Sequence, residues 1–199
     1  HYLNIKMTRV PLSTDYRANV AAMAKVVNRN TIGIAGSAPC WPYGLFDPLK
    51  ELGELALEKN LWLHVDACVG GYLSPFVKKI GYPVPDFDFT LPGVKSIAAD
   101  LHKYGFVAKP CSSILWRHRD LQKYHYFPFD DWPSGPYMTE GFNGSRPAGA
   151  IYSAWAVLRY LGEEGYCSIA KTIMSRKREL DEGIAAIDGL QPWKNDLSM

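Results

Sequence analysis

A strand–helix–strand pattern over residues 31–68 constrains the fold of this chain most. A short apolar run at residues 31–35 precedes an amphipathic segment at residues 47–60 with a proline in its first turn, and a second apolar run follows at residues 61–68. This order and spacing predict a right-handed crossover between two parallel strands. Because parallel sheets are covered on both faces, we expect an α/β fold with a mainly parallel central sheet flanked by helices.

The rest of the chain extends this pattern. Residues 15–28 carry apolar side chains at helical spacing, with Ser13, Thr14 or Asp15 as the expected cap. An aromatic and proline-rich segment at residues 124–137 has no periodicity and predicts a long ordered loop. The other expected elements are strands at residues 94–99 and 111–116 and helices at residues 150–161 and 165–187.

The composition excludes several classes of protein. At 199 residues, 47% hydrophobic and 21% charged, the chain is in the globular range, and its net charge of +2 gives no general attraction to nucleic acid. Its longest uncharged run, residues 30–46, is interrupted by prolines and glycines and cannot be a spanning helix. The four cysteines form no C-x-x-C pair, so we expect no metal site, no disulfide framework and a reducing, cytoplasmic compartment.

Two candidate active-site residues follow predicted strands. Asp66 lies at the end of the run at residues 61–68, and Lys103 follows the strand at residues 94–99. Ligands of open α/β sheets bind outside the carboxyl ends of the strands, so we expect both side chains at one site. A partly desolvated lysine can attack a carbonyl as a neutral amine, and a carboxylate suits a protonated pyridine nitrogen. Together they indicate a pyridoxal 5'-phosphate (PLP) site.

The same residues allow simpler interpretations. A lone lysine is usually a solvated surface charge, and a lone aspartate after a strand usually caps a helix or lies in a turn. The cofactor interpretation gains from the company of His64, Ala67 and His102 in the same two weakly charged segments. On the residues alone, both interpretations stay open.

Several motifs resemble the PLP-dependent group II decarboxylase family of fold type I. Asp66 with Ala67, followed by Asp-x-His-Lys at residues 100–103, is shared broadly in that family. Further segments resemble the branch that cleaves phosphorylated sphingoid bases, and the resemblance runs from residue 1 to about residue 189. These segments include Gly-Ser-Ala-Pro at residues 36–39, His-Val-Asp-Ala-Cys at residues 64–68, Asp-Trp-Pro at residues 131–133 and Gly-Ser-Arg-Pro at residues 144–147. The chain departs from the branch at Cys40, Trp41, Ala148 and Gly149.

The resemblance implies a set of cofactor-binding residues. Lys103 forms the covalent bond to the PLP aldehyde, and Asp66 keeps the pyridine nitrogen protonated. Ala67 lies against the ring. The cofactor phosphate is contacted by His102 and, from the neighbouring subunit of a dimer, by Ser145, and His64 completes the cofactor-binding set.

The resemblance also implies the reaction and the remaining catalytic residues. Tyr104 and Lys109 line the active-site entrance and are candidate catalytic residues beside Lys103, although each could have a structural role only. The reaction is cleavage between C2 and C3 of a phosphorylated long-chain base, which gives a fatty aldehyde and phosphoethanolamine. We expect this substrate and a second copy of the chain, in a homodimer with shared active sites, as partners.

Two alternatives remain: the first concerns the reaction, and the second concerns whether the chain is catalytically complete. One is a PLP-dependent amino-acid decarboxylase of the same family, and the other is a catalytically incomplete fragment. The resemblance places a phosphate-binding loop, a ring-stacking histidine and any membrane anchor upstream, and a small domain downstream. We therefore interpret residues 1–189 as part of the PLP-binding large domain and residues 190–199 as the start of a linker to a C-terminal small domain.

Overall fold

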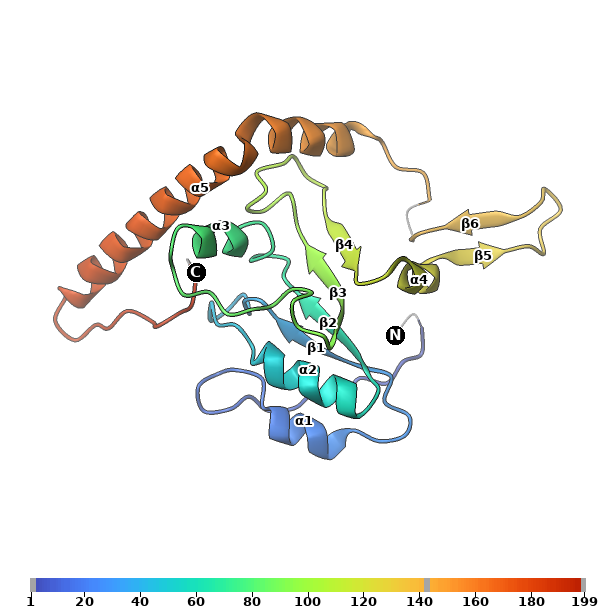
Figure 1. Cartoon of the computed structure of the whole chain (residues 1–199), viewed down its shortest axis with the longest axis horizontal. Coiled ribbons are helices and arrows are strands. Elements are labelled where there is room, and N and C mark those ends of the chain that lie inside the picture. Colours follow the sequence, from blue (N-terminus) through green and yellow to red (C-terminus); the bar gives the residue numbers. More distant parts are fainter. Residues whose placement is uncertain (1–2, 142–143, 198–199) are drawn as a thin grey trace.

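A four-stranded sheet lies at the centre of the computed structural model, which describes residues 3–141 and 144–197 (Figure 1). The strands β1 (Gly33–Ser37), β2 (Trp62–Asp66), β3 (Val94–Ala99) and β4 (Ser113–Trp116) are neighbours in that order. The first three strands are parallel, and β4 runs antiparallel to β3. This arrangement confirms the predicted mainly parallel sheet.

The crossover between β1 and β2 is α2 (Leu49–Glu58), as the sequence predicted. Leu49 and Leu52 of this helix are buried in the main core together with Leu63 and Val65 of β2. Because side chains alternate along a strand, Trp62, His64 and Asp66 of β2 lie on the opposite face, where none of them is fully buried. The main core therefore lies on one face of the sheet.

The first helix is shorter than predicted and begins at a different cap. The helix α1 covers Val20–Val26, and the side chain of Asn19 accepts a hydrogen bond from the backbone N–H of Ala22 at 2.9 Å. Ser13 was one of three expected caps, but its hydroxyl donates to Asp15 in a separate turn. Asparagine is as good a cap as serine, and its position relative to the apolar face decided the outcome.

Two helices cover the end of the sheet that leads into the loops. The short α3 (Ser74–Lys79) packs against the long α5 (Gly149–Ala185), where the rings of Phe76 and Tyr166 stack with centroids 4.7 Å apart. The two helices predicted at residues 150–161 and 165–187 are confirmed as two helical segments of α5, separated by a kink at Gly162 (φ 54°, ψ −172°). The positive φ at this residue costs a glycine little, so the chain turns there and the second helical segment follows at once.

The aromatic segment predicted as a loop at residues 124–137 contains one short strand and ends where a second begins. After α4 (Arg119–Gln122) and η1 (Lys123–His125), β5 (Phe127–Phe129) pairs antiparallel with β6 (Tyr137–Thr139). This hairpin projects away from the body of the protein (Figure 1). No helix in the described part of the chain is long and apolar enough to span a membrane.

The chain after α5 turns back onto the body. Leu197 has no exposed surface and belongs to the main core. The packing of Leu197 in the core does not show where a further domain begins. The predicted boundary at residue 189 and the linker at residues 190–199 therefore stay predictions.

The close approach of α2 to the turn before β3 gives a test of the core. A Cβ on Gly93 would overlap the carbonyl oxygen and Cα of Gly53 in α2. We expect Gly93→Ala to lower the free energy of unfolding by about 1–3 kcal/mol, measured by urea denaturation. The control is Gly183→Ala in α5, where a Cβ meets no atom within 4 Å and alanine favours the helix. Equal stabilities of the two variants would contradict this packing.

Candidate active site

Asp66 is the last residue of β2 and lies at the carboxyl edge of the sheet. Leu63 and Val65 hold the strand in the core, so the alternating pattern directs Asp66 to the partly open face. Its side chain is exposed, and Oδ1 accepts a hydrogen bond from the backbone N–H of Cys68 at 3.1 Å. The carboxylate therefore keeps free acceptor capacity for a ligand.

Lys103 lies in a tight turn that follows β3. The turn is closed by a hydrogen bond from the backbone N–H of Val107 to the carbonyl of Leu101 at 3.1 Å. Gly105 is needed within it, because a Cβ there would overlap the backbone of Leu101. The hydroxyl of Tyr166 in α5 donates to the Gly105 carbonyl at 2.8 Å in a buried contact. Tyr166, which sequence reasoning missed, therefore anchors the lysine turn.

The thiol of Cys68 interacts with both predicted site residues, Lys103 and Asp66. Burial raises the pKa of the Cys68 thiol, which is therefore neutral at physiological pH. The structure thus brings Lys103 and Asp66 within reach of one small side chain.

Lys103 is charged and paired in this structure. Its Nζ lies 3.0 Å from Oδ2 of Asp100, and about a third of its side chain is exposed. Burial alone lowers the pKa of Lys103, but the contacts with Cys68 and Asp100 outweigh burial and raise the pKa above its usual value. Lys103 is thus held here as a paired ammonium, whereas attack on a carbonyl needs a neutral amine. The reason is Asp100, three residues earlier, which the sequence reasoning treated only as part of a motif.

Asp100 is itself held in place from two sides. It accepts hydrogen bonds from the hydroxyl of Ser112 and from Lys103. Burial raises the pKa of the Asp100 carboxyl, but these two partners more than offset it and hold the pKa below its usual value. The carboxylate is consequently a stable anionic partner for the Lys103 ammonium.

His102 is oriented by the strand that follows the lysine turn. Its Nδ1 lies 2.6 Å from the carbonyl oxygen of Cys111, and its backbone N–H donates to the same carbonyl at 3.0 Å. The short Nδ1 contact requires a donated proton, so the longer approach of the Cys111 N–H to Nδ1, at 3.4 Å, cannot be a hydrogen bond in the same tautomer. The predicted contact of His102 with a cofactor phosphate stays a prediction.

His64 shares the partly open face with Asp66. Its Nδ1 lies 2.8 Å from the hydroxyl oxygen of Ser96, which also accepts from Nε1 of Trp62 at 2.8 Å. Burial lowers the pKa of His64, so the ring is mainly neutral at physiological pH. With Trp62 donating to Ser96, the serine proton is available to Nδ1, and the remaining ring proton lies on Nε2.

The other predicted site residues lie in different surroundings. Ala67 is fully buried in the main core, and Tyr104 packs partly buried against that core and edge-to-face with Phe106. Lys109 and Ser145 are exposed, and within residues 3–141 and 144–197 no hydrogen bond or ion pair joins either of them to Lys103 or Asp66. The roles assigned to these four residues stay predictions.

The donor set fits one part of a PLP site. A lysine amine and a carboxylate both interact with the Cys68 thiol. On the neighbouring strands, Ala35 pairs with His64 and Ala98 pairs with Asp66, so small residues flank this edge. Lys103 would hold the aldehyde carbon, and Asp66 would hold the pyridine nitrogen. No cluster of three or more His, Cys, Asp or Glu side chains able to hold a metal occurs among the described residues.

Comparison with known proteins identifies the family. The model of the pyridoxal-dependent decarboxylase conserved domain matches residues 1–189. Sphingosine-1-phosphate lyase of Arabidopsis thaliana is 44% identical over 95% of this chain and 35% of its own length, and sphingosine-1-phosphate lyase 1 of Rattus norvegicus is 39% identical over 96% of the chain and 34% of its own length. The chain therefore spans about a third of the length of these curated relatives.

Solved structures agree with the family match. The sphingosine-1-phosphate lyase of Burkholderia pseudomallei superposes with a TM-score of 0.90 at 39% identity, covering 96% of this chain and 44% of that one. The glutamate decarboxylase of Lactobacillus brevis superposes with a TM-score of 0.82 at 28% identity, covering 98% and 45%. Both likenesses confirm the predicted fold type I architecture. Because the family model matches residues 1–189 of the 199, this chain belongs to the pyridoxal-dependent decarboxylase family.

Proposed function

We propose that this chain carries the lysine and the carboxylate of a PLP-dependent carbon–carbon lyase that cleaves sphingosine 1-phosphate or a similar phosphorylated long-chain base. The observation that carries the proposal is the contact of Lys103 and Asp66 with the same thiol, that of Cys68, at the carboxyl edge of the sheet. The choice of substrate is supported by the lyases of Arabidopsis thaliana and Burkholderia pseudomallei, at 44% and 39% identity. The products are a fatty aldehyde and phosphoethanolamine.

Each residue has a separate task in this reaction. Lys103 would supply the amine that holds the cofactor. Asp66 keeps a proton on the pyridine nitrogen, because a nearby carboxylate favours the charged form of a cationic partner. Bound PLP supplies a ring that accepts the electron pair released on bond cleavage. A base must take the proton of the C3 hydroxyl, and the candidates from this chain are Tyr104 and Lys109.

The second candidate is an amino-acid decarboxylase of the same family. It is favoured by the 28% identity to the glutamate decarboxylase of Lactobacillus brevis and by the 33% identity to a probable L-tyrosine/L-aspartate decarboxylase of Methanothermobacter thermautotrophicus. Both values are below those for the lyases cited above. The products distinguish the two functions, because the lyase releases a fatty aldehyde and the decarboxylase releases carbon dioxide.

The proposal predicts that Lys103 is the residue to which PLP becomes bonded. After incubation with PLP and reduction with borohydride, we expect peptide mapping to find the cofactor on Lys103, with an absorbance band near the visible edge before reduction. Lys103→Ala removes this label, whereas the control Lys109→Ala, which changes an exposed lysine six positions later, retains it. Label spread evenly over surface lysines would contradict the proposal. In a protein that turns over substrate, Lys103→Ala abolishes aldehyde release.

The pairing of Lys103 with Asp100 predicts a pH dependence. Attack on an aldehyde requires the neutral amine, so attachment of PLP to Lys103 should accelerate as pH rises toward its raised pKa. Asp100→Asn removes a carboxylate that stabilises the ammonium, which lowers the pKa and shifts the rate profile to lower pH. The control is Asp86→Asn, which breaks the exposed pair of Asp86 with Lys78 and leaves the profile unchanged. A profile for Asp100→Asn that stays in place or moves to higher pH would contradict the pairing.

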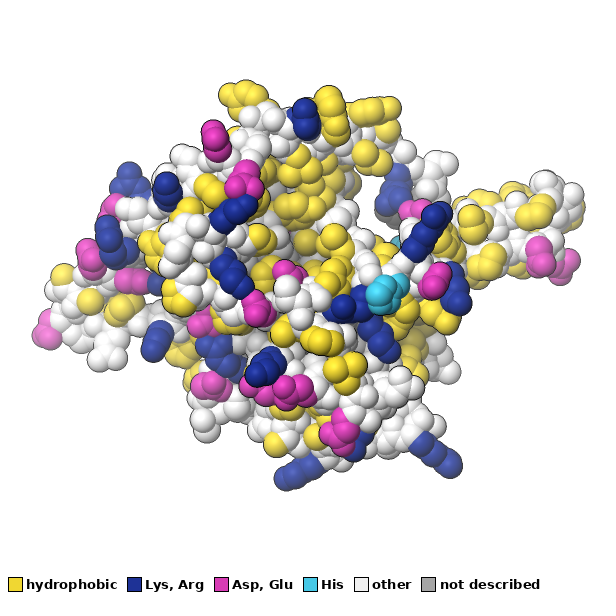
Figure 2. Space-filling model, viewed as in Figure 1, with side chains coloured by type: hydrophobic (Ala, Val, Ile, Leu, Met, Phe, Trp, Pro, Cys, Tyr) yellow, Lys and Arg dark blue, Asp and Glu magenta, His cyan; other side chains and the backbone are white. Residues whose placement is uncertain are grey.

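We also propose that the protein acts as a homodimer with shared active sites. Large apolar side chains are exposed on the β5–β6 hairpin and on the first half of α5, where Figure 2 shows hydrophobic surface. An isolated two-stranded hairpin is only marginally stable in water, and a partner that covers it would stabilise it. These side chains include Phe127, Phe129, Trp132, Met138, Ile151, Tyr152, Trp155 and Tyr160.

The dimer proposal is tested by mass in solution. We expect a dimer by light scattering, and we expect Trp155→Glu, at a residue 66% exposed, to raise its dissociation constant about tenfold or more. The control is Leu180→Glu near the other end of α5, at a residue 63% exposed, which leaves the mass unchanged. A monomer at all accessible concentrations, or equal effects of the two variants, would contradict the proposal.

We propose a cytoplasmic location for the protein, with any membrane association provided by segments outside this chain. The four cysteines are free thiols, which suits a reducing compartment.

A further inference from the structure

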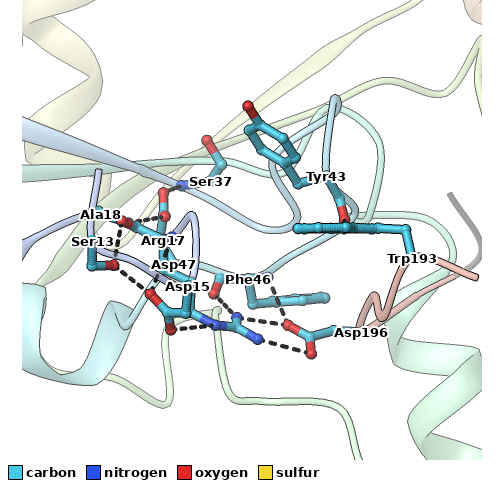
Figure 3. A network of polar contacts seen from close by, with 10 residues as sticks. All are labelled: Ser13, Asp15, Arg17, Ala18, Ser37, Tyr43, Phe46, Asp47, Trp193 and Asp196. Carbon is cyan, nitrogen blue, oxygen red and sulfur yellow. Dashed lines mark hydrogen bonds and ion pairs between the residues drawn. The ribbon is translucent and has the colours of Figure 1, made fainter. Parts of the chain in front are cut away.

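The last described residues of the chain dock on the loop that follows β1, here called the proline loop (residues 38–46). Nε1 of Trp193 donates to the carbonyl of Tyr43 at 2.9 Å, and the backbone N–H of Asp196 donates to the carbonyl of Gly44 at 2.9 Å. The backbone N–H of Phe46 donates to Oδ2 of Asp196, also at 2.9 Å. Residues 193–197, here called the docking tail, therefore satisfy three backbone groups of one loop. Figure 3 shows Trp193 beside Tyr43 and Asp196 beside Phe46.

Arg17 reinforces this contact from a third segment. Its two terminal nitrogens lie 2.7 and 3.0 Å from the two carboxylate oxygens of Asp196, and it also donates to the carbonyl of Phe46. About a quarter of each of the two charged side chains is exposed. A two-point arginine–carboxylate pair of this kind is stronger and more directional than an exposed ion pair. Leu197, fully buried in the main core, fixes the end of the docking tail.

Aromatic side chains close the outer side of the same contact. The ring of Tyr43 lies 4.9 Å from that of Tyr16 and 5.8 Å from that of Trp193, measured between centroids. Tyr43 is thus held by rings from both ends of the chain.

The inner side of the proline loop touches the candidate active site. The backbone N–H of Ala38 donates to the carbonyl of Asp66 at 2.8 Å. Gly70 packs so closely beneath the loop that a Cβ there would overlap the carbonyl of Ala38 and lie 2.8 Å from the ring of Pro39. The turn that begins at Asp66 and includes Cys68 therefore rests directly against the proline loop.

We propose that Asp196 is a positioning residue. Together with Arg17 and Trp193 it holds the proline loop against the turn that carries Asp66, and so sets the position of the Asp66 carboxylate. The role of that carboxylate in binding PLP rests on the proposed function. The contacts themselves involve only residues of this chain. A loop with this connection restrains the turn that begins at Asp66, and release of the docking tail loosens both the loop and that turn.

The cysteines of the chain report on each part of this connection. Cys40 lies in the proline loop, Cys68 lies in the turn after Asp66, and Cys167 lies in α5, away from both. All three are partly buried, so their alkylation rates depend on local opening. The carboxylates that act on the Cys40 thiol are Asp47 and Asp66, so replacing Asp196 does not change the charge around Cys40 directly.

The experiment compares alkylation rates at the three thiols by mass spectrometry in the full chain and in Asp196→Ala. We expect Cys40 to react about tenfold faster and Cys68 about threefold faster, with Cys167 unchanged, because opening is local. The matched control is Asp181→Ala, which removes an ion pair of 2.5 Å with Lys177 on α5 and leaves Cys40 and Cys68 unchanged. Trp193→Phe keeps the aromatic ring but loses the N–H donor, and it should give the same order of rates with smaller changes in a chain that folds.

Two results would overturn the inference. One is an equal change at all three thiols, or none, in both Asp196→Ala and Trp193→Phe, since the docking tail would then have no local effect. The other is faster reaction at Cys40 alone, since the tail would then stabilise the loop without positioning the turn after Asp66. Thiol rates need no cofactor, whereas labelling of Lys103 by PLP and borohydride tests the proposed function, so failure of one is distinguishable from failure of the other.

Discussion

Parallel pairing of β1, β2 and β3 is the constraint on which the rest of the structure depends. The register aligns Ser37 with Asp66, and Asp66 with Ala98, so the three strands end at the same edge. The proline loop, the turn after Asp66 and the turn of Lys103 all leave the sheet at this edge, so strand pairing brings them together. Because side chains alternate, the same register also decides that Asp66 and His64 share one face while Val65 enters the core.

The loops at this edge are held by segments far away in the sequence. Tyr166 of α5 fixes the lysine turn through the carbonyl of Gly105, 61 positions earlier, and Asp196 contacts Arg17, 179 positions earlier. Loops without such contacts open easily, because few buried groups oppose their conformational entropy. The site is therefore assembled by the sheet and held in shape by α5 and the docking tail.

The sequence predicted the elements with local signals and missed the contacts between distant ones. The apolar runs that became β2 and β3 and the proline that opens α2 were visible, since burial and helix starts leave local patterns. The glycine at residue 162 also marked the break between the two helical segments of α5, although the direction of the second segment has no local signal. Tyr166 and Asp196 had no signal at all, since their partners are chosen by the tertiary fold.

The sequence also did not show which of two carboxylates, Asp66 or Asp100, is available to a ligand. The structure gives the two side chains different environments. Asp100 is mostly buried, accepts from Ser112 and is paired with the lysine ammonium, so its charge is compensated within the chain. Asp66 is exposed, and it interacts with the backbone N–H and the thiol of Cys68, but no ion pair joins it to a cation among the described residues. A cationic ring nitrogen approaching from the partly open face would therefore find an uncompensated carboxylate in Asp66 and a compensated one in Asp100. Exposure thus makes Asp66 available to a ligand, whereas the ion pair with Lys103 occupies Asp100.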